Sequence, residues 1–483
     1  MPTNDVRAQV EIGADTNPHG ERAERTVQPF RILVLGDFSA GSGERPPLDE
    51  RRIERVDRDG IDAAITRMAP ALRLSIDPDG EAEVIEFAEL DDFHPDHLLS
   101  RVSTLARIRA LRATVESQPA SPATSSATSR GAGAADGRSL LERMLEAEPP
   151  LVTAREAPRP AAGDDLSDLI RRAVRPHVSR EVDPGQRALV EQVDAVLAAT
   201  LRVLLHHPEF QALEALWRGV DFFMRRCEAE DAHIGLFDIG RAEFLDAVAD
   251  ARGRRALKAR ASRTNDGDPW TLVIAAFTFA PPDVAALSQA AALASESGVP
   301  WLAAADSTLG GAETFANNGD VDDWDTAPVP SWDALRREPS ARYLGLALPR
   351  YLVRLPYGSD NPVDALSFEE LDAGAPSHAS FLWGNPAFPC ALVASTPVER
   401  GRPAPSQGTV GGLPVHVIRT DGDSEGLPCA EALLSQRTVD YLLGRGLTPL
   451  VSERNGDSIR VPRLQSIADP PAPLPIQPAV RDA

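Results

Sequence analysis

The sequence predicts a mixed α/β fold in which sheets are flanked by helices and two parts are joined by a flexible linker. Short apolar runs of the length of buried strands alternate with helical stretches, and this order favours a mostly parallel sheet. The runs and helical stripes occur in two separate blocks of the chain. Between the blocks, residues 119–139 contain no Val, Ile, Leu, Met or aromatic residue, so this stretch cannot bury apolar surface.

The first block follows residues 1–28, a polar segment that we expect to be a flexible N-terminal arm. Residues 29–115 are expected to form the first domain. Its first strand is the apolar run Ile32 to Leu35, and the sequence DPDG at 77–80 predicts a hairpin turn between two further strands. The other elements expected here are helices near 61–69 and 95–111 and strands near 72–76 and 83–87.

Residues 116–163 are expected to be a disordered linker with one short helix at 139–148. This piece reads SLLERMLEAE, and its apolar residues repeat with helical spacing. A helical island within a polar linker is typical of docking motifs. An alternative is that the fragment packs back on its own domain. The candidate docking residues are Leu140, Leu141, Met144 and Leu145.

Residues 164–465 are expected to form the second domain. A helical stripe runs from Leu189 to Leu205, and a second helix follows Pro208. Residues 466–483, which are rich in proline, are expected to be a disordered tail. Beyond these helices, strands are expected at 272–279, 301–305, 343–348 and 415–418, and a helix at 284–297.

The charge of the chain excludes two classes of partner. Lys and Arg number 50 against 72 Asp and Glu, which gives a net charge of −22. Phosphate backbones and anionic lipid surfaces would repel such a chain, so we expect neither nucleic-acid binding nor direct membrane binding. Three features favour a cytoplasmic protein: the three cysteines are scattered, there is no apolar signal sequence, and there is no long apolar span.

A glycine-rich turn follows the first apolar run and has the outline of a phosphate-binding loop. Gly36 and Gly41 have Walker spacing, but Ser42-Gly43 stands where Lys and a hydroxyl residue are required, and Glu44 follows. The Arg-Pro-Pro sequence at 45–47 does not favour a helix start at the phosphate. We therefore interpret the turn as the end of a buried strand and not as a nucleotide site.

Two further motifs fit a structural role better than a chemical one. Residues 422–426 spell G-x-S-x-G, but no histidine follows Ser424, as a hydrolase of that order requires. His94 and His97 form an H-x-x-H beside two aspartates, yet His-Pro-Asp is also a good helix start and no further ligand cluster follows. We therefore expect no catalytic, cofactor-binding or metal-binding residues, no cofactor, and no enzymatic activity.

Several stretches resemble the contractile sheath of bacterial type VI secretion systems. Those of the first block resemble the sheath small subunit: PFRILVLGDF (29–38), RRIERVDRD (51–59) and LDDFHPD (90–96). Those of the second block resemble the large subunit: LHHPEFQ (205–211), LE (213–214), WRG (217–219), ARYLGL (341–346), LPR (348–350), RLPYG (354–358), LWGN (382–385) and GLPVH (412–416). The second resemblance fades after about 450, where the family continues with a long C-terminal portion.

The resemblance implies a natural fusion of a small-subunit-like part and a truncated large-subunit-like part, and we expect the two parts to clasp each other. It implies a structural or assembly component of the sheath that acts through protein–protein contacts. The implied partners are other sheath subunits, inner-tube or baseplate proteins, and an AAA+ unfoldase that grips the helix at 139–148. The alternative is a non-polymerising adaptor, cap or regulator that binds sheath components or this unfoldase.

Overall fold

The computed structural model describes most of both blocks. Its described residues divide into a large unit, at 29–106 and 198–480, and a small unit, at 107–117 and 184–197. Three expected features lie outside the described residues: the arm at 1–28, residues 118–163 of the expected linker, and the four candidate docking residues. The expected domain boundaries stay a prediction. The described residues are 29–43, 45–57, 60–76, 81–117, 184–229, 232–316, 319–324, 327, 329–371, 378–399, 401–420 and 423–480.

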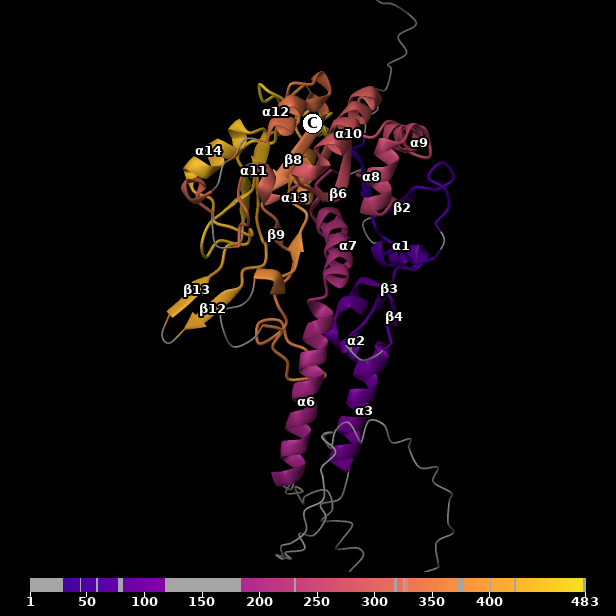
Figure 1. Ribbon diagram of the computed structural model, residues 1–483, viewed down its shortest axis with the longest axis vertical. Coiled ribbons are helices and arrows are strands. Elements are labelled where there is room, and N and C mark those ends of the chain that lie inside the picture. Colours follow the sequence, from indigo (N-terminus) through magenta and orange to yellow (C-terminus); the bar gives the residue numbers. More distant parts are fainter. Residues whose placement is uncertain are drawn as a thin grey trace, which may run out of the picture. The chain divides into compact units, whose positions relative to one another are not determined.

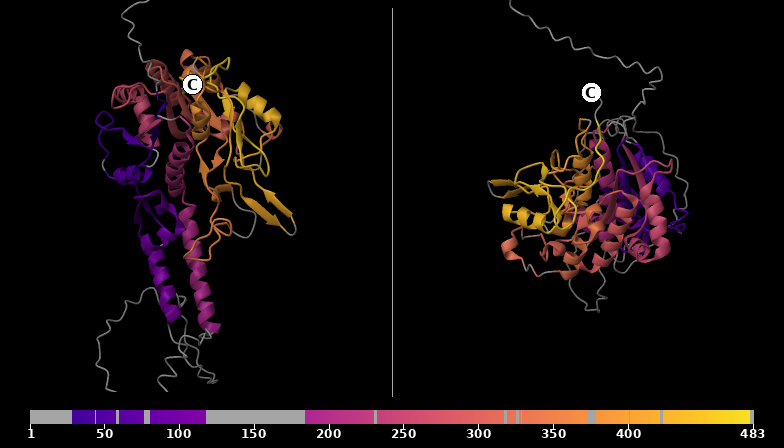
Figure 2. Two further views of the ribbon diagram at one scale, coloured as in Figure 1. Left: turned by 180° about the vertical axis from the view of Figure 1, so that it is seen from behind. Right: turned by 90° about the horizontal axis from the view of Figure 1, so that it is seen from above.

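A seven-stranded sheet forms the centre of the large unit (Figures 1 and 2). Its strands are β1 (Arg31–Gly36), β2 (Glu54–Val56), β5 (His233–Asp238), β6 (Leu272–Phe279), β7 (Trp301–Ala305), β8 (Leu344–Leu348) and β14 (Leu447–Pro449). They lie in the order β14-β8-β7-β6-β1-β5-β2. All neighbours are parallel except β2, which is antiparallel to β5. The mostly parallel sheet that the apolar runs predict is confirmed.

Strand β1 comes from the first block but lies between two strands of the second. Ile32 is in register with Ile234 of β5 on one side and with Leu272 of β6 on the other. Residues 32–35 are at most 1% exposed. A parallel strand with both faces covered reads as an unbroken apolar run, and this explains the sequence of β1.

Helices cover both faces of this sheet. Leu33 and Leu35 of β1 share a core with α8 (Arg241–Ala249), α9 (Ala251–Ser262) and α10 (Val284–Ser297). The other face is covered by α13 (Ala387–Ser395), which packs on β6, β7 and β8 and on α7 (Pro208–Arg226). A Cβ added at Gly219 of α7 would lie 2.5 Å from the Phe388 ring, so this glycine lets α7 and α13 approach closely.

Smaller sheets and short helices surround the central sheet. The helix at 284–297 and the strands at 272–279 and 301–305 are confirmed, and the strands flanking 77–80 pair antiparallel as predicted, although the turn itself is not described. The remaining sheets are β3 (Ala71–Leu74) with β4 (Glu83–Glu86), β9 (Tyr351–Leu352) with β10 (Trp383–Gly384), β12 (Val417–Thr420) with β13 (Asp423–Gly426), and β11 (Gly408–Val410) with β16 (Ile459–Val461) and β15 (Val451–Ser452). The remaining helices are α1 (Ile61–Met68), α2 (Pro95–Arg101), α3 (Ser103–Ser117), α6 (Pro184–Leu205), α11 (Ser307–Gly310), α12 (Pro330–Arg336) and α14 (Gln436–Gly444), with 3-10 turns η1 (Leu90–Phe93), η2 (Pro281–Asp283), η3 (Val321–Asp323), η4 (Pro339–Tyr343) and η5 (His378–Ser380).

The prediction of a disordered tail at 466–483 is wrong for the residues that the structure describes, which reach 480. Ile467 is fully buried and donates its amide to the Leu344 carbonyl oxygen at the start of β8. Leu474 is 8% exposed, and a Cβ added at Gly345 would lie 2.8 Å from it. Proline lacks an amide donor and favours extended backbone, so a segment that alternates proline with apolar residues packs well on a sheet without joining it.

The small unit contains the C-terminal part of α3 and the N-terminal part of α6, which lie side by side (Figures 1 and 2). The guanidinium of Arg112 lies 2.5 Å from a carboxylate oxygen of Asp194. The Gln186 side chain donates to the Val115 carbonyl oxygen, 2.7 Å away. These polar contacts fix the pairing of the two helices.

Candidate functional site

The two blocks meet at a joint, by which we mean β1, β2 and residues 37–53 of the first block together with β5, α7 and α8 of the second. The main chain of β1 is bonded to β5 over six residue pairs and to β6 over four. β2 adds three more pairs on the far side of β5. Separation of the blocks would leave buried backbone groups of three strands without partners, and each such group costs about 1–3 kcal/mol.

Arginines of the first block bind acidic groups of the second at this joint. The Arg51 side chain is 7% exposed and donates to both carboxylate oxygens of Glu243, at 2.8 and 3.0 Å. It also donates to the Asp238 carbonyl oxygen at 2.5 Å. A bidentate pair with a buried arginine gives geometric specificity as well as energy.

The glycine-rich turn after β1 folds around a second arginine. The Arg45 guanidinium lies 3.0 Å from Asp238 and also contacts Asp37. The turn reaches this position through left-handed backbone at Gly41 (φ 69°) and Gly43 (φ 74°). The charge of Arg45 is therefore already neutralised by Asp238 and Asp37. This supports the interpretation of the turn as the end of a buried strand.

Aromatic rings continue the joint onto α7. The Trp217 ring is fully buried, meets the Phe38 ring edge to face at 5.0 Å, and donates its indole N–H to the Phe38 carbonyl oxygen. Further along α7, Phe210 lies 5.7 Å from Phe93 and 6.0 Å from Phe87, ring centre to ring centre. With the exception of Phe87, these rings come from the small- and large-subunit-like motifs that the sequence marks.

A buried charge cluster lies beside these rings. Arg354 is 8% exposed and lies between Glu214 of α7 and Glu370, at 2.8 Å from an oxygen of each. His206 lies 3.7 Å from Glu370, and Arg218 lies 2.7 Å from Glu214. Two buried carboxylates therefore share one buried arginine, and Glu214 also pairs with the more exposed Arg218.

The charge cluster holds the Glu370 carboxylate ionised. Burial alone would raise the pKa of Glu370, but the charge of Arg354 and hydrogen bonds from Arg354 and the Tyr357 amide lower this pKa to about 2. Burial also raises the pKa of Tyr357 to about 12, and its ring lies 4.2 Å from the Arg354 guanidinium carbon. The cluster is therefore a charged structural element at neutral pH.

The cluster also connects to the first block. The His94 ring meets the Tyr357 ring edge to face at 4.9 Å. The carboxylate of Asp96 accepts the backbone amides of Asp364 at 3.2 Å and Ala365 at 2.8 Å. The histidine motif thus contributes to the contact between blocks, and His94 also accepts the Asp96 amide as the cap of α2.

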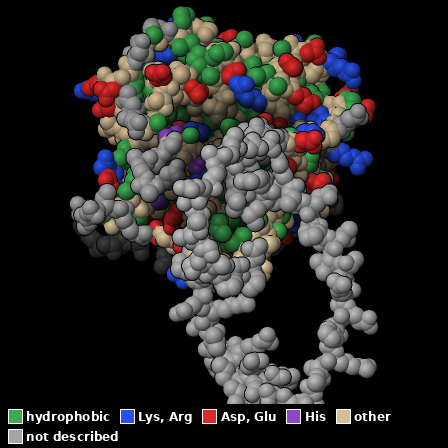
Figure 3. All heavy atoms as spheres, turned by 60° about the horizontal axis from the view of Figure 1, so that its bottom comes forward, with side chains coloured by type: hydrophobic (Ala, Val, Ile, Leu, Met, Phe, Trp, Pro, Cys, Tyr) green, Lys and Arg blue, Asp and Glu red, His purple; other side chains and the backbone are tan. Residues whose placement is uncertain are grey.

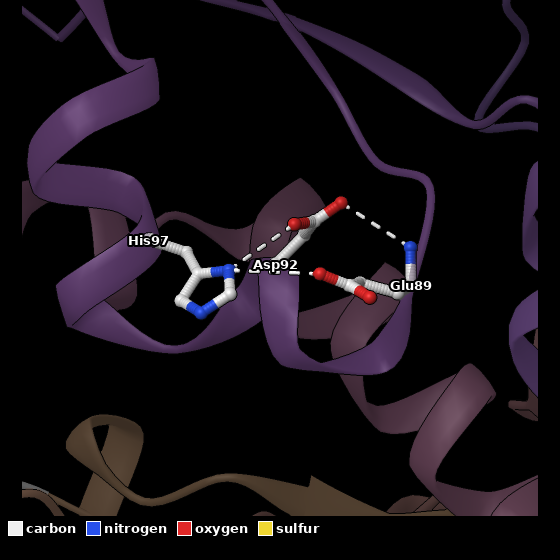
Figure 4. Close-up of side chains that lie close together, drawn as sticks. All are labelled: Glu89, Asp92 and His97. Atoms are coloured by element: carbon white, nitrogen blue, oxygen red, sulfur yellow. Dashed lines mark hydrogen bonds and ion pairs between the residues drawn. The ribbon is translucent and has the colours of Figure 1, made fainter.

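The second histidine of this motif lies in a group that could hold a metal ion by composition. Glu89, Asp92 and His97 bring their ligand atoms within 4.8 Å of one another (Figure 4). However, the buried Asp92 carboxylate already accepts hydrogen bonds from the amides of Ala88 and Glu89 and from Arg101, at 2.7, 3.2 and 2.6 Å. All three donors bind Oδ2, and Oδ1 faces Nδ1 of His97 at 3.4 Å. We interpret the group as the closure of the turn before α2, because its buried carboxylate ties that turn together.

The other sequence motifs lie away from the joint. Ser424 of the G-x-S-x-G sequence lies within β13, paired antiparallel with Arg419 of β12, and not at a strand-to-helix turn. Cys227, Cys390 and Cys429 are all buried with free thiols. Burial raises the pKa of Cys429 to about 11, so this thiol is protonated at neutral pH.

Sequence reasoning missed Glu370, which none of the sheath-like motifs contains. It identified Glu214 and Arg354 as members of motifs but gave them no role. Their contact joins residues 140 positions apart, and a single sequence carries no signal for such a pair.

The described helices and one face of the molecule bear on the kinds of partner the chain could bind. Among the described residues, no helix combines the length and the apolar character that a membrane crossing needs. On the face shown in Figure 3, acidic and basic side chains are interspersed. This pattern does not favour a partner of a single charge on that face.

Two family models match successive parts of the chain. The one described as EvpB/VC_A0108, tail sheath N-terminal domain, matches residues 187–468. The one described as type VI secretion system, VipA, VC_A0107 or Hcp2, matches residues 4–120. Strands β1 and β2 fall in the VipA match, and the other five strands of the central sheet fall in the VipB match.

One curated relative agrees with these matches. The type VI secretion system sheath protein TssC1 of Pseudomonas aeruginosa is 28% identical over an alignment of 316 positions that covers 61% of this chain. The matched region covers 63% of the length of that relative. The similarity therefore concerns a large part of each protein and not the whole of either.

Proposed function

Because the chain belongs to the type VI secretion tail-sheath family, with VipA-like and VipB-like parts fused in one polypeptide, we propose that it is a structural component of the contractile sheath. The observation that carries this proposal is the position of β1 between β5 and β6. A small-subunit-like strand completes the central sheet of the large-subunit-like part. The fusion therefore supplies, from one chain, a unit equivalent to a pair of sheath subunits.

In this proposed role the chain acts through contact surfaces and not through catalysis. Its charge pairs are consistent with this role, since Arg51 of the first block binds Glu243 of the second, and Arg354 binds Glu214 and Glu370 within the second block. Buried, mutually paired charges specify how parts fit together, a use that is attested in other proteins. The energy of contraction would then reside in contacts between copies of this unit.

The proposed partners follow from this role. We expect other sheath subunits to bind this chain, and inner-tube or baseplate proteins to contact the assembled sheath in the cytoplasm. We also propose that an AAA+ unfoldase grips Leu140, Leu141, Met144 and Leu145. Strand addition is a suitable mode of contact between copies, because it uses main-chain hydrogen bonds and needs only an accessible strand edge.

Electron microscopy of the purified chain tests the proposal. We expect tubes from the chain alone, or the chain built into tubes when conventional sheath subunits are added. Binding to the ends of tubes without incorporation along them would instead indicate the adaptor or cap. No binding to tubes in either preparation would contradict a role in the sheath.

A further inference from the structure

Helix α9 concentrates positive charge in a chain that is acidic overall. The whole chain has a net charge of −22, whereas the segment 251–263, which is α9 and the residue after it, contains six cationic residues and no acidic one. We call these six side chains the basic surface. They are Arg252, Arg254, Arg255, Lys258, Arg260 and Arg263.

The placement of these cations does not stabilise the helix that carries them. The first turn of a helix favours acidic side chains, but the first turn of α9 has none and contains Arg252 and Arg254. Arg255 lies three residues from both Arg252 and Lys258, and like charges at this spacing repel each other. The basic surface is therefore not explained by the stability of α9 itself.

Two cations of the basic surface are paired with carboxylates. Arg252 lies 3.0 Å from Asp49, and Lys258 lies 2.8 Å from Glu296. The four side chains are 42% to 73% exposed. Exposed pairs of this kind contribute little free energy, so they do not prevent a stronger contact with another acidic group.

The other four cations keep their charge. Arg254, Arg260 and Arg263 donate to backbone carbonyl oxygens, which satisfy hydrogen bonds without neutralising the charge. Arg255 is exposed and makes no hydrogen bond or ion pair with a described side chain. The carboxylate at the start of the helix, that of Asp250, accepts two backbone amides as the cap. The basic surface therefore has an excess of positive charge.

A second charged surface, of opposite sign, lies on η3 and α14. Asp320, Asp322, Asp323 and Asp440 are all exposed, and we call these four carboxylates the acidic surface. Arg437 is the one cation of the two elements and pairs with Asp322. Carboxylates therefore outnumber cations on this surface.

The two surfaces lie at opposite edges of one layer of helices. Leu257 of α9 and Leu442 of α14 belong to the same core, so both helices cover the same face of the central sheet. Helix α14 packs on edge strand β14, and η3 packs on α14. Near the other edge, the Asn265 side chain, just after α9, donates to the Ile53 carbonyl oxygen directly before β2. Figure 1 shows α9 and α14 on opposite sides of the sheet.

This separation prevents the surfaces of one copy from neutralising each other. The two edge strands are six strand spacings apart in the sheet, or about 29 Å. At physiological ionic strength, charges are screened over about 8 Å. Each surface therefore remains open to a partner outside its own copy.

We propose that the basic surface binds the acidic surface of a second copy of this chain. A contact between two different surfaces on opposite edges repeats from copy to copy, and it forms either a closed ring or a helical filament. Nucleic acids and anionic lipids also attract cations, but the net charge of −22 repels them. The inference deepens the proposed function and rests on it, because it names the surfaces through which copies adjoin in the sheath.

Carbodiimide cross-linking of the full-length chain tests the contact. The reagent joins an amine to a neighbouring carboxylate, and Lys258 is the one lysine of the chain, so every link to a lysine reports on α9. Labelled and unlabelled copies are mixed, and links are mapped by mass spectrometry. The link from Lys258 to Glu296 within one copy serves as the internal control. We expect links between copies from Lys258 to the acidic surface. Links between copies that reach only other carboxylates, or no links between copies, would overturn the proposal.

Charge-reversal variants test each surface separately. Arg255→Glu and Asp440→Arg change exposed positions, so we expect both variants to keep the parental stability. Arg460→Glu is the matched control, because Arg460 is exposed on β16, outside both surfaces. We expect the yield of links between copies to fall about fivefold in each variant and to be unchanged in the control. An equal fall in the control would overturn the assignment to α9.

A mixture of the two variants tests the direction of the contact. The Asp440→Arg copy keeps an intact basic surface, and the Arg255→Glu copy keeps an intact acidic surface. We therefore expect links from Lys258 of the first copy to the acidic surface of the second, and not in the reverse direction. Links in neither direction, or equal links in both, would overturn the contact between unlike surfaces.

Failure of this contact can be distinguished from failure of the proposed function. Electron microscopy of Arg255→Glu with conventional sheath subunits provides the comparison. Incorporation into tubes at the parental level, without links between copies, would overturn the contact and leave the proposed function standing. Links to the acidic surface in a chain that binds no tubes would support the contact and contradict the proposed function.

Discussion

The Arg354 guanidinium lies 2.8 Å from the Glu214 carboxylate, and 140 residues of sequence separate the two. Glu214 belongs to α7, which also supplies Trp217 and Phe210 to the joint between the two blocks. Arg354 extends the contact to Glu370 and stacks on Tyr357, which in turn meets His94 of the first block. The pair is therefore the centre of a contact that connects both subunit-like parts of this sheath-family chain.

Arg354→Met should destabilise the protein strongly. The variant leaves Glu214 and Glu370 buried without the cation they share, and loss of one partner of a buried ion pair costs about 3–5 kcal/mol. Urea unfolding at pH 7, followed by tryptophan fluorescence, measures the change. Arg225→Met is the matched control, because Arg225 pairs with Asp221 on the same helix but its side chain is 69% exposed. We expect the control to lose at most about 1 kcal/mol. Similar losses in both variants would contradict a central role for the cluster.

Stability should fall in acid, and Glu370 should contribute to the fall. Its pKa is about 2 in the folded protein against an ordinary value of 4.5, so below pH 4.5 the unfolded state binds more protons than the folded state. The contribution is complete above about pH 4.5 and is lost as the pH falls toward 2. One group of this kind adds up to about 1.4 kcal/mol per pH unit to the slope.

The pH dependence is measured from urea midpoints between pH 6 and pH 3. We expect Glu370→Gln to be less stable than the parent protein at pH 6 and to have a shallower dependence on pH. Glu453→Gln, at an exposed position, serves as the control and should keep the parental slope. Parallel curves for Glu370→Gln and the parent would show that Glu370 titrates normally.

Gly219→Ala should destabilise the contact between α7 and α13. Alanine favours a helix over glycine by about 1 kcal/mol, but its Cβ would lie 2.5 Å from the Phe388 ring, and overpacking of this kind costs about 1–3 kcal/mol. Gly444→Ala is the matched control, because Gly444 ends α14 and nothing lies within 4 Å of its Cβ position. Thermal unfolding should show a lower midpoint for Gly219→Ala and an equal or higher one for Gly444→Ala. A rise in both would mean that the Phe388 ring adjusts without cost.

Local patterns in the sequence predicted the central elements well. The apolar runs at 272–279 and 301–305 and the helix at 284–297 are β6, β7 and α10 with the same bounds. These elements are buried along their length or along one face, so hydrophobic periodicity alone marks them. The resemblance to the sheath family then supplied the expectation that the two blocks clasp each other, which the shared sheet bears out.

The sequence was less informative where tertiary contacts override composition. Prolines at 470–478 suggested an unfolded tail, but Ile467, Leu474 and Ile476 lie buried there. The pairing of Arg354 with Glu214 and Glu370 had no local signal, since burial of a charge is decided by elements distant in sequence. The residues of the glycine-rich turn after β1 are enough to argue against nucleotide binding. That the turn folds around Arg45, which binds Asp238, could be seen only in the structure.

Cutting the chain between the two parts should leave them together. A site-specific protease sequence can be inserted after Ser126, which is outside the described residues and belongs to neither block. Because β1 is bonded to β5 and β6 on both sides and is at most 1% exposed from Ile32 to Leu35, we expect both fragments to elute at the volume of the intact protein in size-exclusion chromatography. Val34→Asp buries a charge in the middle of β1, so the cut variant should separate, whereas the cut Val84→Asp control should not. Separation of the cut parent protein in native buffer would contradict the joint as the contact that unites the two sheath-like parts.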